Sequence, residues 1–279
     1  MSPLALTISY DGARFAGAQA QPGQRTVQGT LEAALTRLFG RPSKVVLAGR
    51  TDRGVHAAGQ VVGCDDGRSD WTMDRLRIAL DALLPPDLAV VQVDRRPAGF
   101  HARYDAVWRE YRYRIWTGGR APLARTMVWE RRGPIDLAAL QAGAALFVGT
   151  RDFATFAGGG EGTPWSERRA RPRGTTRTVI RCDARVIEPW WEPPRDGRHC
   201  IEVRVAADGF LPHMARTMTA ALVEIGQGRR PPTWLSELLT AADRRAGPPT
   251  APAHGLVLWR VGYDDDALDD WTPMTAGAG

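Results

Sequence analysis

The sequence predicts an α+β fold in which two β-α-β-β-α-β halves share one continuous, mainly antiparallel sheet. The first observation behind this prediction is the order of the periodic segments over residues 4–95, which run strand, helix, strand, strand, helix, strand. The second is a looser repeat of that order over residues 106–264. This is the ferredoxin-like arrangement, in which helices cover one face of an antiparallel sheet. Because two similar halves lie side by side, we expect a central cleft between them as the ligand site.

The N-terminal half opens with a strand and a helix. Residues 4–12 alternate, are rich in β-branched side chains and end in a turn signal, which predicts a strand. Apolar residues at helical spacing predict a helix over 27–40. Thr26 can cap the first turn of this helix, and Gly40 is suited to end it.

Two further strands, a second helix and a fourth strand complete this half, at 43–49, 56–65, 72–85 and 88–95. The polar loop RTDRGV, residues 50–55, separates the first two of these strands. Pro85 and Pro86 end the helix, because proline lacks the N–H that a helix interior needs.

The C-terminal half contains the same kinds of element. Its predicted segments are a strand at 106–116, a helix at 136–149, a hairpin of strands at 177–191 and 198–210, helices at 211–228 and 232–243, and a strand at 255–264. The expected division of the chain is 1–103 for the N-terminal half, 104–264 for the C-terminal half with a basic insertion at 157–177, and 265–279 for an acidic, disordered tail.

Composition excludes several classes of function. A hydrophobic content of 43% is ordinary for a globular protein, and no apolar run reaches the ~20 residues of a membrane span. The first residues carry no basic and apolar leader, so we expect no secretory signal and a cytoplasmic location. The three cysteines show no C-x-x-C spacing and the five histidines no metal-ligand spacing. We therefore expect neither a disulfide framework nor a metal site.

The charge of the chain points to a polyanionic partner. Net charge is +6, although residues 264–279 carry five aspartates and no base. Nearly all the cations are arginine, since Lys44 is the only lysine. A genome rich in G and C also favours arginine codons and accounts for part of this bias. Arginine nevertheless binds phosphate in a bidentate manner and stacks on bases, as a nucleic-acid partner requires.

The insertion at 157–177 is rich in glycine, proline and arginine, which predicts a surface loop rather than a buried element. Its arginines have two interpretations. They either face solvent as part of an ordinary insertion or grip phosphate groups of a bound nucleic acid.

Asp52 is the acidic residue of the stretch AGRTDRGVHAAGQV, where it lies between Arg50 and Arg53. Neighbouring cations favour an ionised carboxylate. A loop aspartate also commonly does no more than hydrogen-bond to nearby amides. The stretch lacks the second carboxylate of a hydrolytic pair, a metal-binding cysteine and the repeated glycines of a phosphate loop. What this loop offers is one ionised carboxylate.

Two other stretches carry candidate ligand-binding side chains. Tyr111 and Tyr113 lie on one face of a predicted strand, because side chains repeat every second residue. Aromatic rings beside arginines either stack on bases or pack in the core. Arg216 lies about one turn inside a predicted helix among apolar neighbours. A guanidinium in such surroundings needs an anionic partner.

These stretches belong to a longer series of motifs that spans almost the whole chain. In chain order they are YDG, GAQAQ, TVQGTLEAAL, AGRTDRGVHAAGQV, FHAR, REYRYRIW, DF-x-TF with Ala154 at x, GFLPHMAR and PAHGLVLWRVGYD. With them the sequence strongly resembles the TruA class of tRNA pseudouridine synthases. The pseudouridine synthase fold that the resemblance implies agrees with the two halves and the cleft expected above.

The resemblance implies an isomerase that converts uridine to pseudouridine in tRNA, at positions 38, 39 and 40 of the anticodon stem-loop. It implies a homodimer that uses no metal or organic cofactor. It matches Asp52 to the catalytic aspartate, Tyr111 to the active-site tyrosine and Arg216 to the arginine that pairs with the aspartate. The residues expected to bind the RNA are Tyr111, Arg50, Arg53, His56, Gln60, Arg103, Arg168, Arg169, Arg171 and Arg173.

This reaction explains why a single carboxylate suffices. The N-glycosidic bond breaks, the uracil turns and its C5 joins C1′, so no water is consumed and no hydrolytic pair is needed. Asp52 acts either as a nucleophile at C1′ or as a base at the 2′ carbon, and the sequence leaves both open. The target base must first leave the stack.

The chain departs from the family pattern at a few positions. Ala18 stands where a tryptophan is usual, Arg53 where a small residue is common, and Ala157 where an arginine is frequent. The first alternative function is a diverged pseudouridine synthase that acts on another RNA or a free nucleotide. The others are a non-catalytic RNA-binding protein and a basic module that binds protein. The combination of an ionised carboxylate, a tyrosine and an arginine argues against binding alone.

Overall fold

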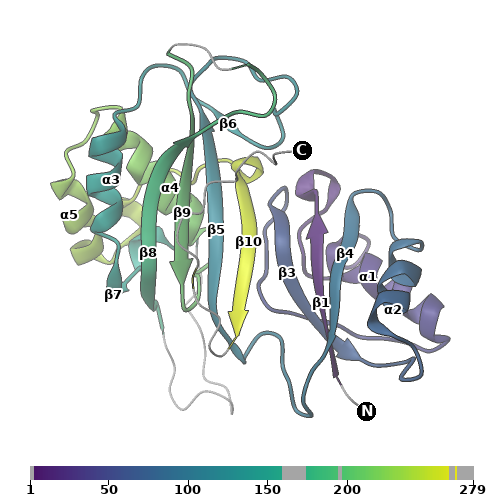
Figure 1. Ribbon diagram of the computed structural model, residues 1–279. Helices are drawn as coiled ribbons and strands as arrows, with labels where there is room; N and C mark the ends of the chain where they lie inside the picture. Colours follow the sequence, from purple (N-terminus) through teal and green to yellow (C-terminus); the bar gives the residue numbers. More distant parts are fainter. Residues whose placement is uncertain (1–2, 159–173, 194–196, 264–267, 269–279) are drawn as a thin grey trace.

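The computed structural model describes residues 3–158, 174–193, 197–263 and 268 (Figure 1). The N-terminal half contains β1 (Pro3–Tyr10), α1 (Val27–Phe39), β2 (Val46–Leu47), β3 (His56–Asp65), α2 (Met73–Asp81) and β4 (Leu88–Arg95). The C-terminal half contains β5 (Ala106–Trp116), β6 (Trp129–Glu130), α3 (Leu137–Ala145), β7 (Gly149–Asp152), β8 (Thr176–Ile187), β9 (Cys200–Ala207), α4 (Met214–Gly226), α5 (Thr233–Ala241) and β10 (Leu256–Tyr263). The expected tail at 265–279, apart from Leu268, and most of the expected basic insertion lie outside the described residues.

The strands form one sheet with the main order β4-β1-β3-β10-β5-β9-β8-β7, while β2 pairs with β3 and β6 with β5. Each half therefore repeats the ferredoxin-like order, as β4-β1-β3-β2 and as β10-β5-β9-β8. Among the described strands, β10 with β3 and β6 with β5 are the parallel pairs. The predicted α+β fold, with two similar halves in a continuous and mainly antiparallel sheet, is confirmed.

Strands β3 and β10 join the two halves. Their parallel ladder is short, with two residue pairs that involve His56 and Ala57 of β3. By comparison, β5 and β9 form eight pairs. The two strands also come close at Gly59, where a Cβ would lie 2.5 Å from the backbone oxygen of Trp259. The close approach of the halves therefore requires a glycine at this position.

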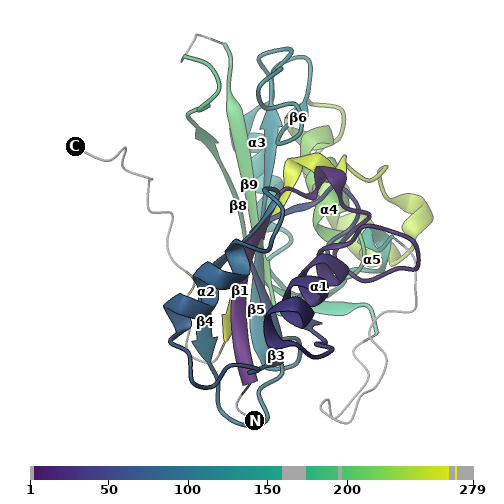
Figure 2. The same cartoon turned by 90° about the vertical axis from the view of Figure 1, so that its right-hand side faces the viewer.

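Several helices lie together on one side of this sheet. In Figure 2, α1, α4 and α5 lie together on one side. Helix α3 packs on α4 and β8, and the side chain of Gln141 donates a hydrogen bond of 2.8 Å to the carbonyl of Ala184 in β8. The main apolar core runs through both halves. Within the ranges that the structure describes, no helix has the length and apolarity needed to cross a membrane.

Local signals set the ends of α1. The hydroxyl of Thr26 accepts a hydrogen bond from the N–H of Gly29 at 3.2 Å, which satisfies a free donor of the first turn. Gly40 follows the helix with φ 68°, in the left-handed region that favours glycine. The predicted start and end of this helix are both confirmed.

Tertiary contacts shorten two other predicted elements. The expected strand at 43–49 is reduced to the two residues of β2, because the N–H of Val45 donates to a glutamate of α1 instead of a neighbouring strand. The helix expected over 72–85 ends at Asp81, whose carboxylate accepts a hydrogen bond of 2.7 Å from the N–H of Val90. The short strands β6 and β7 were not predicted.

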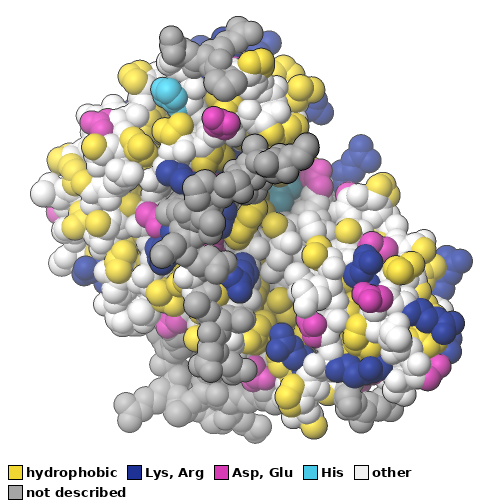
Figure 3. Space-filling view, in the orientation of Figure 1, with side chains coloured by type: hydrophobic (Ala, Val, Ile, Leu, Met, Phe, Trp, Pro, Cys, Tyr) yellow, Lys and Arg dark blue, Asp and Glu magenta, His cyan; other side chains and the backbone are white. Residues whose placement is uncertain are grey.

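The positive charge on one face of the molecule is dispersed. Figure 3 shows dark blue lysine and arginine side chains scattered over the N-terminal half, with acidic side chains between them. Charges of mixed sign favour solubility and do not by themselves form an anion site. A binding site for a polyanion has to be sought elsewhere.

Candidate active site

The loop that carries Asp52 is held at both ends by hydrogen bonds. The side-chain amide of Gln60 accepts from the N–H of Gly49 at 3.1 Å and donates to its carbonyl at 2.7 Å. The N–H of Val55 donates to the carbonyl of Asp52 at 3.1 Å. Gly54 closes this turn with φ 82°, a conformation that disfavours other residues. The carboxylate of Asp52 therefore projects from a fixed backbone.

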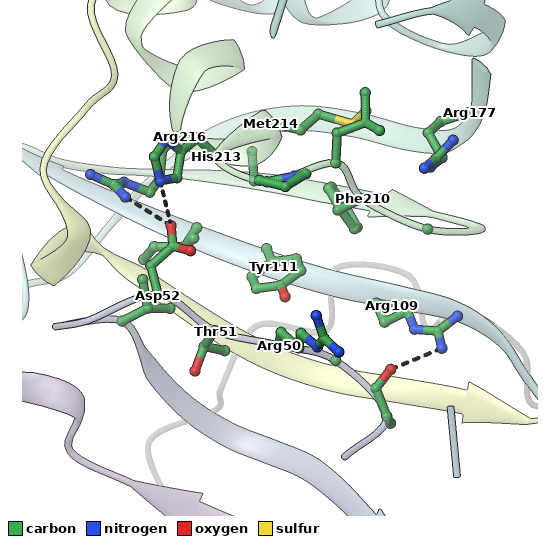
Figure 4. A pocket seen from close by; sticks show the side chains of 18 of the residues that line it. Arg50, Thr51, Asp52, Arg109, Tyr111, Arg177, Phe210, His213, Met214 and Arg216 are labelled. Carbon is green, nitrogen blue, oxygen red and sulfur yellow. Dashed lines mark hydrogen bonds and ion pairs between the residues drawn. The ribbon is translucent and has the colours of Figure 1, made fainter. Parts of the chain in front are cut away.

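A cavity of about 490 Å³ lies between the two halves, and Asp52 is on its wall (Figure 4). The N-terminal half contributes loop residues 48–52 to the lining. The C-terminal half contributes side chains of β5 and the segment 209–216, which leads into α4. This volume is that of a small-molecule site, and the position is the central cleft that the two halves predict.

Asp52 and Arg216 meet across this cavity. Nη1 of Arg216 donates to Oδ2 of Asp52 at 2.8 Å, although 164 residues separate the two in sequence. Nε of the same guanidinium donates to the carbonyl of Ala251 at 2.8 Å. The side chain of Arg216 is 15% exposed and that of Asp52 is 35% exposed. The arginine is thus fixed at two points, and the carboxylate faces the cavity.

Tyr111 lies opposite this pair, on β5. Its ring is buried and contacts Phe210 edge to face, with the ring centroids 4.8 Å apart. The hydroxyl has no hydrogen-bond partner among the described residues. Burial raises the pKa of Tyr111 well above its usual value, with a further increase from the neighbouring Tyr10. The side chain therefore presents a neutral phenol to the cavity.

Four arginines besides Arg216 line the cavity: Arg50, Arg103, Arg109 and Arg177. Of these, Arg50 is exposed and Arg103 is half-buried, so both are placed to meet a charged ligand. Arg109 is buried instead, and its guanidinium donates to the carbonyls of Ala48 at 3.0 Å and Ala106 at 2.9 Å. These two carbonyls belong to opposite halves. Arg109 therefore holds the walls of the cavity together.

Three of the expected RNA-binding residues do not line the cavity. Arg53 is exposed outside it, and Gln60 is buried in its bonds to the Asp52 loop. His56 is also buried, where Nδ1 accepts from the N–H of Gly12 at 3.0 Å and Nε2 contacts the carbonyl of Thr126 at 2.6 Å. His56 and Gln60 thus brace the loop from behind. The expected contacts Arg168, Arg169, Arg171 and Arg173 lie outside the described residues.

The sequence reasoning missed Arg109 and His213. Arg109 is two residues from Tyr111 on the same strand, so the period of two already places both on one face. His213 lies with Nε2 at 3.4 Å from Oδ2 of Asp52. His213 falls inside the helix expected over 211–228, but α4 begins only at Met214, and the left-handed backbone of His213 that precedes it gave no signal in the sequence.

The site places a carboxylate beside a neutral phenol, and it can bind anionic groups at its rim. These are the means for acid–base or nucleophilic chemistry at a polar ligand. Where the structure describes the chain, no three or more histidine, cysteine or acidic side chains are grouped so that they could hold a metal ion.

Comparison with known proteins gives consistent matches along the chain. The sequence model of a family described as tRNA pseudouridine synthase matches residues 6–105 and 144–264. A protein named tRNA pseudouridine synthase A from Geobacillus kaustophilus is 38% identical over 94% of each chain. A protein of the same name from Solidesulfovibrio magneticus is 41% identical over 94% of this chain and 92% of that protein. A third, from Halalkalibacterium halodurans, is 37% identical over 97% of this chain and 96% of its own.

Proposed function

Because the chain belongs to the tRNA pseudouridine synthase family, we propose that it isomerises uridine to pseudouridine in tRNA, with Asp52 as the catalytic carboxylate. The proposal extends to positions 38, 39 and 40 of the anticodon stem-loop. The observation that carries it is the 2.8 Å contact between Asp52 and Arg216 on the wall of a cavity that Tyr111 shares. A carboxylate held in place by a guanidinium suits a reaction that needs one acidic group.

The reaction leaves the composition of the nucleoside unchanged. The bond from N1 of uracil to C1′ breaks, the base turns within the cavity, the bond from C5 to C1′ forms, the proton on C5 leaves and N1 takes up a proton. Asp52 either adds to C1′ and is later displaced, or takes the proton from the 2′ carbon and later returns it. Arg216 holds the carboxylate in position in both schemes.

Tyr111 has two tasks in this scheme. Its ring stacks on the turned base, because its face borders the cavity and aromatic rings bind bases of any sequence. Its neutral hydroxyl, which lacks a partner among the described residues, takes the proton lost from C5 as it passes its own proton to water in the cavity. The target uridine reaches this position only after it has left the helical stack.

The RNA backbone meets arginine at the rim of the cavity. Arg50 and Arg103 line it and are accessible. We assign a supporting role to Arg168, Arg169, Arg171 and Arg173, since a basic stretch adds affinity that depends on salt.

We also propose a cytoplasmic homodimer whose protomers each contain the units 1–103 and 104–264. Large apolar side chains at the surface support the dimer. Leu123 is 74% exposed and Trp190 is 68% exposed. The ring of Trp190 contacts Trp191 of the small apolar cluster that also includes Trp116, and Leu123 directly precedes Ala124 of that cluster in the chain. Exposed apolar residues of this size are common where a protein meets a partner.

The proposed function is tested with the variant Asp52→Asn. The purified protein is incubated with unmodified tRNA, and pseudouridine is mapped by carbodiimide labelling. We expect product at the anticodon stem-loop from the unaltered protein and from the exposed-loop control Asp70→Asn, but none from Asp52→Asn. All three proteins should bind tRNA alike, because phosphate contacts dominate affinity. Product from Asp52→Asn would refute the role of this carboxylate, and no product from the unaltered protein would refute the activity.

A further inference from the structure

His213 and Arg216 approach the same oxygen atom of Asp52. Figure 4 shows the carboxylate with both side chains directed at it. Nη1 of Arg216 is 2.8 Å from Oδ2, and Nε2 of His213 is 3.4 Å from Oδ2. The other oxygen, Oδ1, has no hydrogen bond within the described residues. The two oxygens of this carboxylate are therefore in different surroundings, one held and one free.

The backbone of His213 is in a strained conformation. It has φ 62° and ψ −3°, in the left-handed region that side chains other than glycine rarely adopt. Among the described residues, Ala242 is the other non-glycine residue with positive φ. Ala242 follows the end of α5, where a left-handed residue is common.

No such rule explains His213, because it precedes α4, where the residue is normally extended. Its side chain also makes no capping hydrogen bond to the helix. The strain therefore has no role in ending or starting a helix. Strain of this kind is often kept where it positions a functional group.

The spacing of the two side chains follows from this turn. His213 directly precedes α4 and Arg216 lies on its first turn, and both side chains reach Oδ2 of Asp52. The imidazole is packed on its other side by Gly158, where even a Cβ would overlap the ring. Gly158 is itself fixed, because its N–H donates to the carbonyl of Pro212 at 2.7 Å. The ring is thus held between Gly158 and Asp52.

We infer that His213 is a positioning residue for Asp52, which acts with Arg216 to fix Oδ2 and leaves Oδ1 as the oxygen that reacts with the nucleoside. This inference rests on the proposed function. A single hydrogen bond lets a carboxylate rotate about the bond to its own Cβ. A second contact at the same oxygen restricts that rotation, so that Oδ1 stays directed into the cavity. Correct orientation of a reacting atom is worth much of the rate in enzymes of any class.

The variant His213→Gly tests the role of the imidazole while it keeps the left-handed backbone conformation. Glycine adopts the left-handed conformation freely, so the fold and the start of α4 are retained while the imidazole is lost. Ala242→Gly is the matched control, since it relieves the same kind of strain away from the cavity. Both variants are compared with the unaltered protein and with Asp52→Asn in single-turnover assays on unmodified tRNA.

We expect His213→Gly to lower the single-turnover rate about ten- to hundredfold, because a small misplacement of a reacting group costs up to about a hundredfold in rate. The dissociation constant for tRNA should change less than about twofold, because His213 makes no phosphate contact in this scheme. Free imidazole should restore part of the rate of His213→Gly by occupying the vacated space beside Gly158. It should leave Ala242→Gly and Asp52→Asn unaffected.

Two outcomes would overturn the inference. One is a rate for His213→Gly equal to that of the unaltered protein. The other is a slower rate that imidazole does not restore and that a matching loss of tRNA affinity accompanies, since a merely structural residue would act in this way. If His213→Gly does not fold, His213→Asn is judged by the rate and affinity criteria, because asparagine tolerates the left-handed region. An inactive unaltered protein would refute the proposed function instead.

Discussion

Replacing Tyr111 with phenylalanine should separate the stability of the protein from its activity. The change removes the hydroxyl and nothing else. Within the described residues that hydroxyl has no hydrogen bond to lose, and the edge-to-face contact with Phe210 remains. We therefore expect the free energy of unfolding to change by no more than about 0.5 kcal/mol. Tyr111→Ala, by contrast, should cost about 3 to 5 kcal/mol, because it empties the space of a buried ring.

The same change should strongly impair the reaction. A positioned acid or base typically contributes about a hundred- to ten-thousandfold to a rate. Burial keeps the hydroxyl of Tyr111 protonated at neutral pH, so it is able to pass on a proton that another group brings to it. Stacking by the ring is retained in the phenylalanine variant. The loss should therefore appear in the single-turnover rate, while the affinity for tRNA changes little.

The assay is release of tritium from tRNA that carries [5-³H]uridine, since the label leaves C5 only when the new bond has formed. Urea unfolding of the same samples gives the stability, and filter binding gives the affinity. Full turnover of Tyr111→Phe with an unchanged pH dependence would remove the hydroxyl from the chemistry. A loss of more than about 2 kcal/mol of stability would show that the hydroxyl has a structural partner.

Three further predictions concern other residues. Arg216→Lys should lower the single-turnover rate about tenfold or more at similar tRNA affinity, because an ammonium group cannot reach both the carboxylate of Asp52 and the carbonyl of Ala251 as the planar fork does. Arg109→Met should cost about 3 kcal/mol or more in urea unfolding, since buried carbonyls lose their donor. Burial lowers the pKa of His254, so the unfolded chain binds the proton more readily. Stability should therefore fall as pH drops below about 6.5, and His254→Gln should lessen that fall in urea titrations at several pH values.

Elements governed by local signals could be predicted from the sequence. Helix α1 has apolar periodicity, a threonine cap and a terminal glycine, and all three act within a few residues. The strand order of each half follows from the sequence of elements, because few topologies join them with short connections. β2 could not be predicted at its true length. The hydrogen bond that shortens it, from the N–H of Val45, goes to a distant helix.

The candidate site also has features that the sequence predicts and features that it does not. The residues alone show that Arg216 needs an anion, but they do not identify Asp52 as that anion across 164 positions. The family resemblance supplied the pairing. The contact of His213 depends on a left-handed backbone angle that no nearby glycine or asparagine signals. Residues expected to touch RNA, such as Gln60, instead support the loop, since polarity in sequence does not distinguish a ligand contact from an internal brace.

The short ladder between β3 and β10 is a narrow joint between the two halves of one continuous sheet. Asp52 is on one side of that joint, and Arg216 and Tyr111 are on the other. A nucleic acid that touches both walls adds contacts across two strands whose shared ladder is short. We therefore expect a bound nucleic acid to stiffen this joint, and its release to restore freedom of movement to the two halves.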